Sequence, residues 1–228
     1  MYNPIYIGDS INKIVSEGER RKYYRFRYAP YYGGIATADC VGCNLRCVYC
    51  WAWRVVSNPK KYGKFYSPSE VVEKLLKIAR EEGVKRVRIS GNEPTLNKEH
   101  LLKVLDSIPN KISFILETNG VLIGYDEKYA GELKKFKNLH VRVSLKGSSK
   151  EEFSKFTGAS PEWFEFQLKA LKNLVKNGVE CHAAVIEIAE DISSLRERVE
   201  KIGTWLEVEP LIRYQHVVRR LRRIGIRV

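Results

Sequence analysis

Residues 43–50 read Cys-Asn-Leu-Arg-Cys-Val-Tyr-Cys, which places Cys43, Cys47 and Cys50 in a C-x3-C-x2-C pattern. Three thiolates held so close together along the chain suit a compact metal centre. An iron–sulfur cluster usually takes four cysteine ligands, so three cysteines leave one iron without a protein ligand. The pattern therefore predicts a cluster with an open iron, where chemistry can take place.

Other uses of the cysteines fit less well. Five cysteines in 228 residues are an odd and sparse set without a secretory signal, which argues against disulfides. Zinc is the alternative metal, but a structural zinc site normally needs a fourth Cys or His at matching spacing, and none follows closely. The remaining Cys40 and Cys181 are predicted to be buried strand residues. These two are too few to build a second four-cysteine cluster.

The composition predicts one large hydrophobic core. Of the 228 residues, 44% are hydrophobic, and the net charge is +13 from 40 basic and 27 acidic residues. Such a charge gives a surface that attracts anions, or alternatively the charge-rich surface typical of thermophile proteins. We find no apolar run long enough to cross a bilayer and no targeting segment. A site of free thiols implies a reducing compartment, so we expect a cytoplasmic protein.

Strand-like and helix-like segments alternate along the chain. Strands are expected over residues 34–39, 84–89, 112–116, 139–145, 179–187 and 205–211. Helices are expected from the capping box at 67–70 up to Gly83, over 97–107, 126–136 and 193–202, from Ser149, and from Ser160 to Val175. Strands separated by helices of this length pair in parallel through right-handed crossovers. The sequence therefore predicts an α/β protein with a parallel sheet.

Polar motifs follow the second, third and fourth expected strands, as the cysteines follow the first. These motifs are Gly91-Asn92-Glu93-Pro94, then Thr118-Asn119-Gly120, then Ser144 and Lys146. In a parallel barrel the carboxyl ends of the strands meet at one rim, where active sites lie. We therefore expect all four motifs to converge.

The cysteine pattern, with the aromatic Tyr49 before its last cysteine, resembles the signature of the radical S-adenosylmethionine (SAM) enzymes. The resemblance implies a partial (β/α)6 barrel, a [4Fe-4S] cluster on the three cysteines, and SAM chelated to the fourth iron. Residues 91–94 are similar to the family's GGEP segment, which binds the methionine amino group, with Asn92 in place of a glycine. The resemblance implies that the SAM contacts are Tyr49, Gly91, Asn92, Glu93, Pro94, Thr118, Asn119, Ser144 and Lys146.

Within this superfamily, the order of the motifs is most similar to that of the glycyl-radical-enzyme activating enzymes, such as pyruvate formate-lyase activating enzyme. Their fourth strand ends in Asp-Leu-Lys, where residues 144–146 here read Ser-Leu-Lys. The Cys50-Trp51 pair is instead similar to the radical SAM enzyme that builds the tricyclic wyosine base in tRNA.

Both likenesses imply an oxidoreductase that reductively cleaves SAM to a 5'-deoxyadenosyl radical, which takes a hydrogen atom from a macromolecular substrate. That substrate is a protein in the first case and RNA in the second. An electron donor such as ferredoxin or flavodoxin is implied. No catalytic side chain is predicted, because the cofactors carry the chemistry. A non-enzymatic iron–sulfur or zinc protein is the third hypothesis.

Three regions are expected: a basic and aromatic N-terminal extension (1–33), a radical SAM core barrel (34–212) and a basic C-terminal segment (213–228). Residues 20–28 interleave cations with aromatic rings, which suits phosphate contacts and base stacking. The C-terminal segment carries six arginines and no acidic residue. Such charge runs are also typical of solvated faces and of surfaces that dock on acidic proteins.

Overall fold

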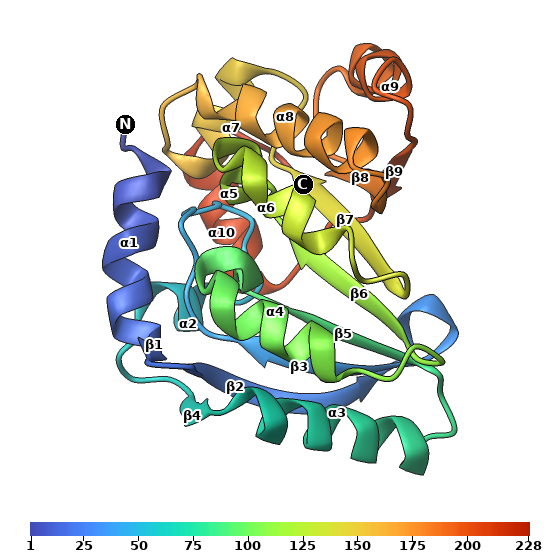
Figure 1. Ribbon diagram of the computed structural model, residues 1–228. Coiled ribbons are helices and arrows are strands. Elements are labelled where there is room, and N and C mark those ends of the chain that lie inside the picture. Colours follow the sequence, from blue (N-terminus) through green and yellow to red (C-terminus); the bar gives the residue numbers. More distant parts are fainter.

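Six parallel strands form the centre of the protein in the computed structural model, which describes residues 1–228 (Figure 1). In order across the sheet, they are β3 (Ile35–Cys40), β5 (Arg86–Gly91), β6 (Ser113–Thr118), β7 (Leu139–Leu145), β8 (Glu180–Ile186) and β9 (Leu206–Glu209). Every neighbouring pair in this series is parallel. All six strands predicted from the sequence are therefore present, and the α/β fold with a parallel sheet is confirmed.

The helices between these strands cover one face of the sheet (Figure 1). They are α3 (Pro68–Glu81), α4 (Lys98–Ser107), α5 (Val121–Tyr125), α6 (Glu127–Leu133), α7 (Lys150–Thr157), α8 (Trp163–Lys176) and α9 (Ile192–Glu200). The predicted capping box begins α3: Ser67 Oγ accepts from the Glu70 backbone N–H at 3.2 Å, and the Glu70 carboxylate accepts from the Ser67 N–H at 2.7 Å. Helix α8 begins after a turn at 161–162, slightly later than predicted.

The main hydrophobic core lies between the sheet and these helices. Because successive strand residues point to opposite faces, every second residue joins this core, as Val87 and Ile89 of β5 and Val141 and Val143 of β7 do. The residues between them point to the other side of the sheet, which we call the inner face. The inner face is therefore free to carry polar groups.

The N-terminal residues join the same sheet. Helix α1 (Pro4–Val15) leads into β1 (Ser16–Glu17) and β2 (Arg20–Ala29), and β2 pairs antiparallel with both β3 and β4 (Lys64–Tyr66). None of these elements was predicted. A short 3-10 turn, η1 (Tyr31–Gly33), then connects β2 to β3.

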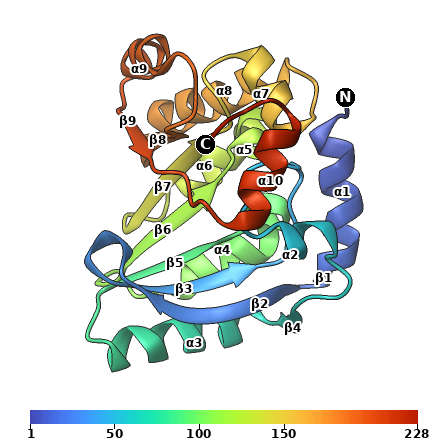
Figure 2. The ribbon, with the colours of Figure 1, turned by 180° about the vertical axis from the view of Figure 1, so that it is seen from behind.

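The basic C-terminal segment contains a helix, α10 (Gln215–Arg223), which lies on the inner-face side of the sheet (Figure 2). Val217 and Leu221 of this helix are fully buried and pack with Ile186 and Leu211. The segment is thus folded onto the body of the protein. None of the helices combines the length and the apolar character that crossing a membrane requires.

Candidate metal and cofactor site

The three cysteines lie on the loop between β3 and α2 (Trp53–Ser57), which we call the cysteine loop (residues 41–52). Gly42 fixes its start: the φ angle is 93°, and a Cβ here would lie 2.7 Å from Ile11 of α1. The Gly42 carbonyl accepts a hydrogen bond from the backbone N–H of Glu93 at 2.9 Å. The cysteine loop is therefore held against both α1 and the loop that follows β5.

All three thiols are free, with Cys47 buried and Cys43 and Cys50 half-buried. The Cys50 N–H donates to the Cys47 carbonyl at 3.1 Å, and the Val48 N–H donates to the carbonyl of Phe156 at 2.8 Å. No three Cys, His, Asp or Glu side chains are placed to hold a single metal ion.

The surroundings of the free thiols disfavour their ionisation when no metal is bound. Burial raises the pKa of Cys43 well above its ordinary value, and the charges of Glu93 and Cys47 raise it further. Burial and the charge of Cys47 likewise raise the pKa of Cys50 to about 12. Mutually repelling thiolates need a bound cation such as iron. Burial also raises the pKa of Cys47, but the nearby Lys146 and Arg220 oppose the rise.

Glu93 joins the loops that follow three of the strands. Its carboxylate is fully buried and accepts hydrogen bonds from the Thr95 N–H and hydroxyl, the Thr118 hydroxyl at 2.6 Å and the Asn119 N–H at 2.7 Å. Asn119 in turn donates to Asn44 of the cysteine loop at 2.7 Å. The cysteine, Gly-Asn-Glu-Pro and Thr-Asn-Gly motifs are thus brought together. The Glu93 side chain acts as a brace within the protein.

Asn92, in contrast, has both side-chain polar atoms buried without a partner. The Tyr49 hydroxyl and the Asn44 amide nitrogen are also buried and unpaired. Buried polar groups in proteins are nearly always hydrogen-bonded, so unpaired ones beside three thiols fit a polar ligand. These residues and the thiols therefore suit a [4Fe-4S] cluster with SAM on its open iron.

Ser144 and Lys146 lie at the end of β7, and the Lys146 ammonium donates to the Ser144 hydroxyl at 2.6 Å. Lys146 is half-buried and close enough to Cys47 and Cys50 to oppose the rise in their pKa values. Gln167 of α8, which the sequence did not indicate, ties this strand end to the Thr-Asn-Gly loop. Its amide accepts from the Lys146 N–H at 3.0 Å and donates to the Asn119 carbonyl at 2.5 Å.

Arg21 of β2 is a further residue that the sequence analysis missed. Its buried guanidinium donates to the carbonyls of Glu93 at 2.6 Å and Pro94 at 2.8 Å, and it also lies 3.6 Å from the thiol of Cys40. Arg21 belongs to the basic and aromatic stretch considered above as an RNA contact. Its charge serves the Gly-Asn-Glu-Pro loop instead.

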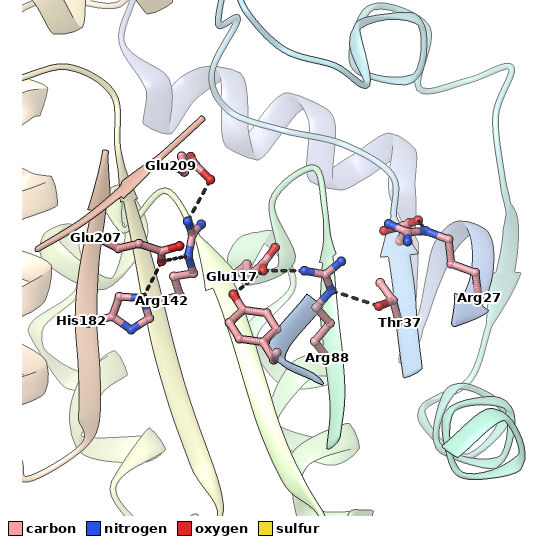
Figure 3. A network of polar contacts seen from close by, with 10 residues as sticks. Arg27, Thr37, Arg88, Glu117, Arg142, His182, Glu207 and Glu209 are labelled. Carbon is pink, nitrogen blue, oxygen red and sulfur yellow. Dashed lines mark hydrogen bonds and ion pairs between the residues drawn. The ribbon is translucent and has the colours of Figure 1, made fainter. Parts of the chain in front are cut away.

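The inner face below this rim carries a continuous set of charged and polar side chains (Figure 3). Arg88 donates to Thr37 at 3.0 Å and to Glu117 at 2.6 Å. Arg142 donates to Glu207 and Glu209, each at 2.8 Å. The remaining members are Arg25, Arg27, Tyr32, Asp39 and His182.

Neighbouring cations and hydrogen-bond donors hold the carboxylates of Glu117 and Glu207 in their charged forms. Burial alone would raise the pKa of Glu117, but Arg88 and Arg142 bring it below its ordinary value. A hydrogen bond from His182, together with Arg142, lowers the pKa of Glu207 to about 2. The inner face thus offers fixed guanidinium and carboxylate groups next to the cysteine loop.

The sequence did contain a signal for the inner face. A strand buried on both sides reads as a continuous apolar run, whereas β5 reads Val87-Arg88-Ile89 and β7 reads Val141-Arg142-Val143. A charge between two core residues marks a second, polar face. Cys40 and Cys181 lie on strands as predicted, although Cys181 is only half-buried.

The chain has similarities to known proteins over most of its length. A probable GTP 3',8-cyclase from Methanococcus vannielii is 30% identical over 184 residues, which are 77% of this chain but only 59% of that relative. The chain thus spans about three fifths of the length of this relative. Further relatives, such as those from Helicobacter pylori and Archaeoglobus fulgidus, carry the same enzyme name. These names do not support the predicted likeness to glycyl-radical-enzyme activating enzymes.

Solved structures share the fold. Streptococcus suis SuiB bound to S-adenosylmethionine superposes with a TM-score of 0.62 at 20% identity, over 81% of this chain and 44% of SuiB. Native anSMEcpe with bound AdoMet superposes with a TM-score of 0.58 at 23% identity, over 77% and 52% of the two chains. The model of the radical SAM superfamily matches residues 39–202, from the last two residues of β3 to just beyond α9. The chain therefore belongs to the radical SAM superfamily.

Proposed function

We propose that the chain cleaves SAM at a [4Fe-4S] cluster and uses the resulting radical on a purine nucleotide, with GTP as the first candidate. The observation that carries the proposal is the cysteine loop, which combines three free thiols with the buried, unpaired polar atoms of Asn44 and Tyr49. This loop follows β3, a strand of the sheet whose inner face is charged. When bound, the cluster and SAM supply a one-electron reduction that yields an adenosyl radical able to abstract a hydrogen atom. A ferredoxin or flavodoxin is our proposed electron donor.

The residues of the chain hold and orient these groups. Cys43, Cys47 and Cys50 bind the iron, and Asn92 and Lys146 are placed to contact the polar parts of SAM. Gly91 supports a close approach of this loop, because a Cβ there would lie 3.1 Å from Asp39 and Cys40 of the neighbouring strand.

The inner face supports a nucleotide substrate. Arg142 is buried and bonded to both Glu207 and Glu209, so it orients these two partly exposed carboxylates. Carboxylates such as those of Glu207 and Glu209 accept hydrogen bonds from the N–H groups of a guanine edge. The names of the relatives point to the same substrate and to a cyclisation, so we propose a cyclase rather than the predicted oxidoreductase. In β2, Arg21 is buried within the protein, and Arg25 and Arg27 pair with Asp39, so the basic stretch gives less support to RNA.

The test uses the anaerobically reconstituted chain with dithionite, SAM and GTP that carries deuterium at C3'. Joining C3' to C8 requires the hydrogen on C3' to leave, so we expect deuterium to appear in 5'-deoxyadenosine together with a cyclised nucleotide. Replacement of Arg142 by Met should reduce this transfer. The matched variant Arg198→Met alters an arginine that pairs with Glu165 on the outer helices, and should leave the transfer unchanged.

Mass spectrometry of both products separates the possible results. If 5'-deoxyadenosine forms slowly and GTP has no effect on its formation, GTP is rejected as the substrate. The proposal that the chain cleaves SAM would still stand. Loss of the cluster signal on replacing Cys43, Cys47 or Cys50 by Ala, with its retention in Cys40 and Cys181 variants, would support the assigned ligands. Stoichiometric zinc without a cluster would reject both parts of the proposal.

A further inference from the structure

Helix α10 lies against the cysteine loop, far from it in the sequence. Arg220 donates from Nη2 to the carbonyl of Cys47 at 2.7 Å, and its guanidinium lies 3.6 Å from the ring centroid of Trp53. His216, one turn earlier on the same helix, contacts the Trp51 carbonyl at 3.1 Å. The helix therefore touches the cysteine loop at two positions one helical turn apart.

The position of Arg220 is set by apolar packing and not by its own charge. Val217 and Leu221 are fully buried, and their cluster extends to Val48 and Tyr49 of the cysteine loop. These contacts fix α10 from its apolar side. The Arg220 side chain is thereby held over the loop, stacked on an aromatic ring.

Arg220 is a partly buried cation without an acidic partner. It forms no ion pair with any Asp or Glu, and its Nη1 group is buried without a hydrogen-bond acceptor. A desolvated guanidinium in this state is unfavourable unless a negative charge lies nearby. The guanidinium is bonded to the Cys47 carbonyl, so a negative charge on the sulfur atoms of Cys47 and Cys50 would attract it. The missing counter-charge is thus on the side of the cysteines.

We propose that Arg220 is a positioning residue for the cluster: its guanidinium supplies the counter-charge to the thiolate-bound cluster and raises the reduction potential of that cluster. Adding an electron makes the cluster more negative, and a fixed cation beside it stabilises the reduced form. The potentials of iron–sulfur clusters depend on net charge, on hydrogen bonds and on exposure to water. Of these, Arg220 contributes a positive charge, and its hydrogen bond to the Cys47 carbonyl holds that charge beside the cysteine loop.

The test compares the midpoint potential of the reconstituted cluster in four full-length chains, by redox titration followed with EPR and in the absence of SAM. Arg220→Gln is expected to shift the potential to more negative values. Arg220→Lys keeps the charge but loses the planar fork, and should give an intermediate shift. The matched control is Arg223→Gln, which removes an exposed arginine from the same helix and should match the parent.

The outcomes separate a redox role from a purely structural one. EPR reports only the chains that hold a cluster, so the potential can be compared even where the iron content falls. An unchanged potential in Arg220→Gln would overturn the proposal, whether or not iron is lost. An equal shift in Arg223→Gln would also overturn it, because any surface charge would then have the same effect. A change in SAM affinity with no change in potential would assign Nη1 to the SAM carboxylate instead.

Discussion

At the scale of single residues, the site rests on long-range polar contacts around a local motif. The cysteine spacing can be recognised from eight neighbouring residues, and it predicts Cys43, Cys47 and Cys50 as the metal ligands. Arg21 and Gln167 have no such local signature, because they act on carbonyl groups 73 and 48 residues away. Residues that hold a site in place are therefore harder to predict than residues that bind a metal.

Glu93 is the central brace, and its loss should be costly. Glu93→Ala leaves four buried donors on Thr95, Thr118 and Asn119 without an acceptor, each at about 1–3 kcal/mol. We expect the free energy of unfolding of the iron-free chain to fall by at least about 3 kcal/mol. Glu99→Ala, which removes an exposed carboxylate, should change it by less than about 0.5 kcal/mol. Urea denaturation measures the free energy of unfolding of both variants. Equal stability of the two would contradict the role of Glu93 as a brace.

His100 predicts a dependence of stability on pH. Burial lowers its pKa from 6.5 to about 4, and the charge of Arg21 lowers it further, whereas the hydrogen bond with the Glu19 carbonyl opposes this shift. The unfolded chain therefore takes up a proton before the folded chain does, and stability is lost as the pH falls from about 6.5 towards 4. Between pH 7 and 5 this contribution is about 2 kcal/mol.

The control for this prediction is His100→Gln, which cannot titrate. The free energy of unfolding of the parent chain should fall more between pH 7 and pH 5 than that of the variant. Denaturant titrations at the two pH values give this difference. Parallel losses in the two chains would show that other groups cause the pH dependence.

At the scale of elements, the apolar strands and the capped helices follow from local patterns, and the basic elements do not. The end points of β7 agree with the prediction because it alternates between core and polar residues and is bounded by turns. In β2 and α10 most residues are charged or polar, so their few buried residues, such as Tyr23 and Leu221, are easily overlooked. Their burial depends on neighbours elsewhere in the chain, which no local pattern shows.

The contact between α5 and α8 gives a prediction at this scale. A Cβ on Gly124 of α5 would lie 1.8 Å from the carbonyl oxygen of Phe166 on α8, so Gly124→Ala must push the helices apart. We expect a loss of about 2 kcal/mol or more in the free energy of unfolding. Gly131 of α6 is a matched helical glycine whose Cβ would be in ordinary contact at 3.7 Å.

Gly131→Ala should therefore raise stability by about 0.5–1 kcal/mol, because alanine loses less backbone entropy in a helix. Thermal unfolding of the two variants alongside the parent tests the pair. The two variants should change the free energy of unfolding in opposite directions. A loss of similar size in both would show that the close contact between α5 and α8 is not the cause.

At the scale of the whole molecule, the N-terminal residues complete the barrel from the side of β3. β2 covers the edge of β3 along six registered residue pairs, and the Arg21 side chain reaches from β2 to the rim. α1 packs Ile11 and Val15 beside Val41 at the start of the cysteine loop. The first 33 residues, expected as an extension before the core barrel, therefore lie next to the metal ligands.

A chain that begins at residue 34 tests this arrangement. It would expose the unpaired edge of β3 and remove the bonds from Arg21 to the Glu93 and Pro94 carbonyls, so we expect aggregation and little bound iron. Arg21→Met is the matched variant: it keeps β2 and the sheet edge covered, and should remain soluble with weaker iron retention. Size-exclusion chromatography, thermal unfolding and an iron assay compare the three chains. If the shortened chain unfolds cooperatively and retains iron as the full chain does, residues 1–33 are a separate extension and the barrel does not need them.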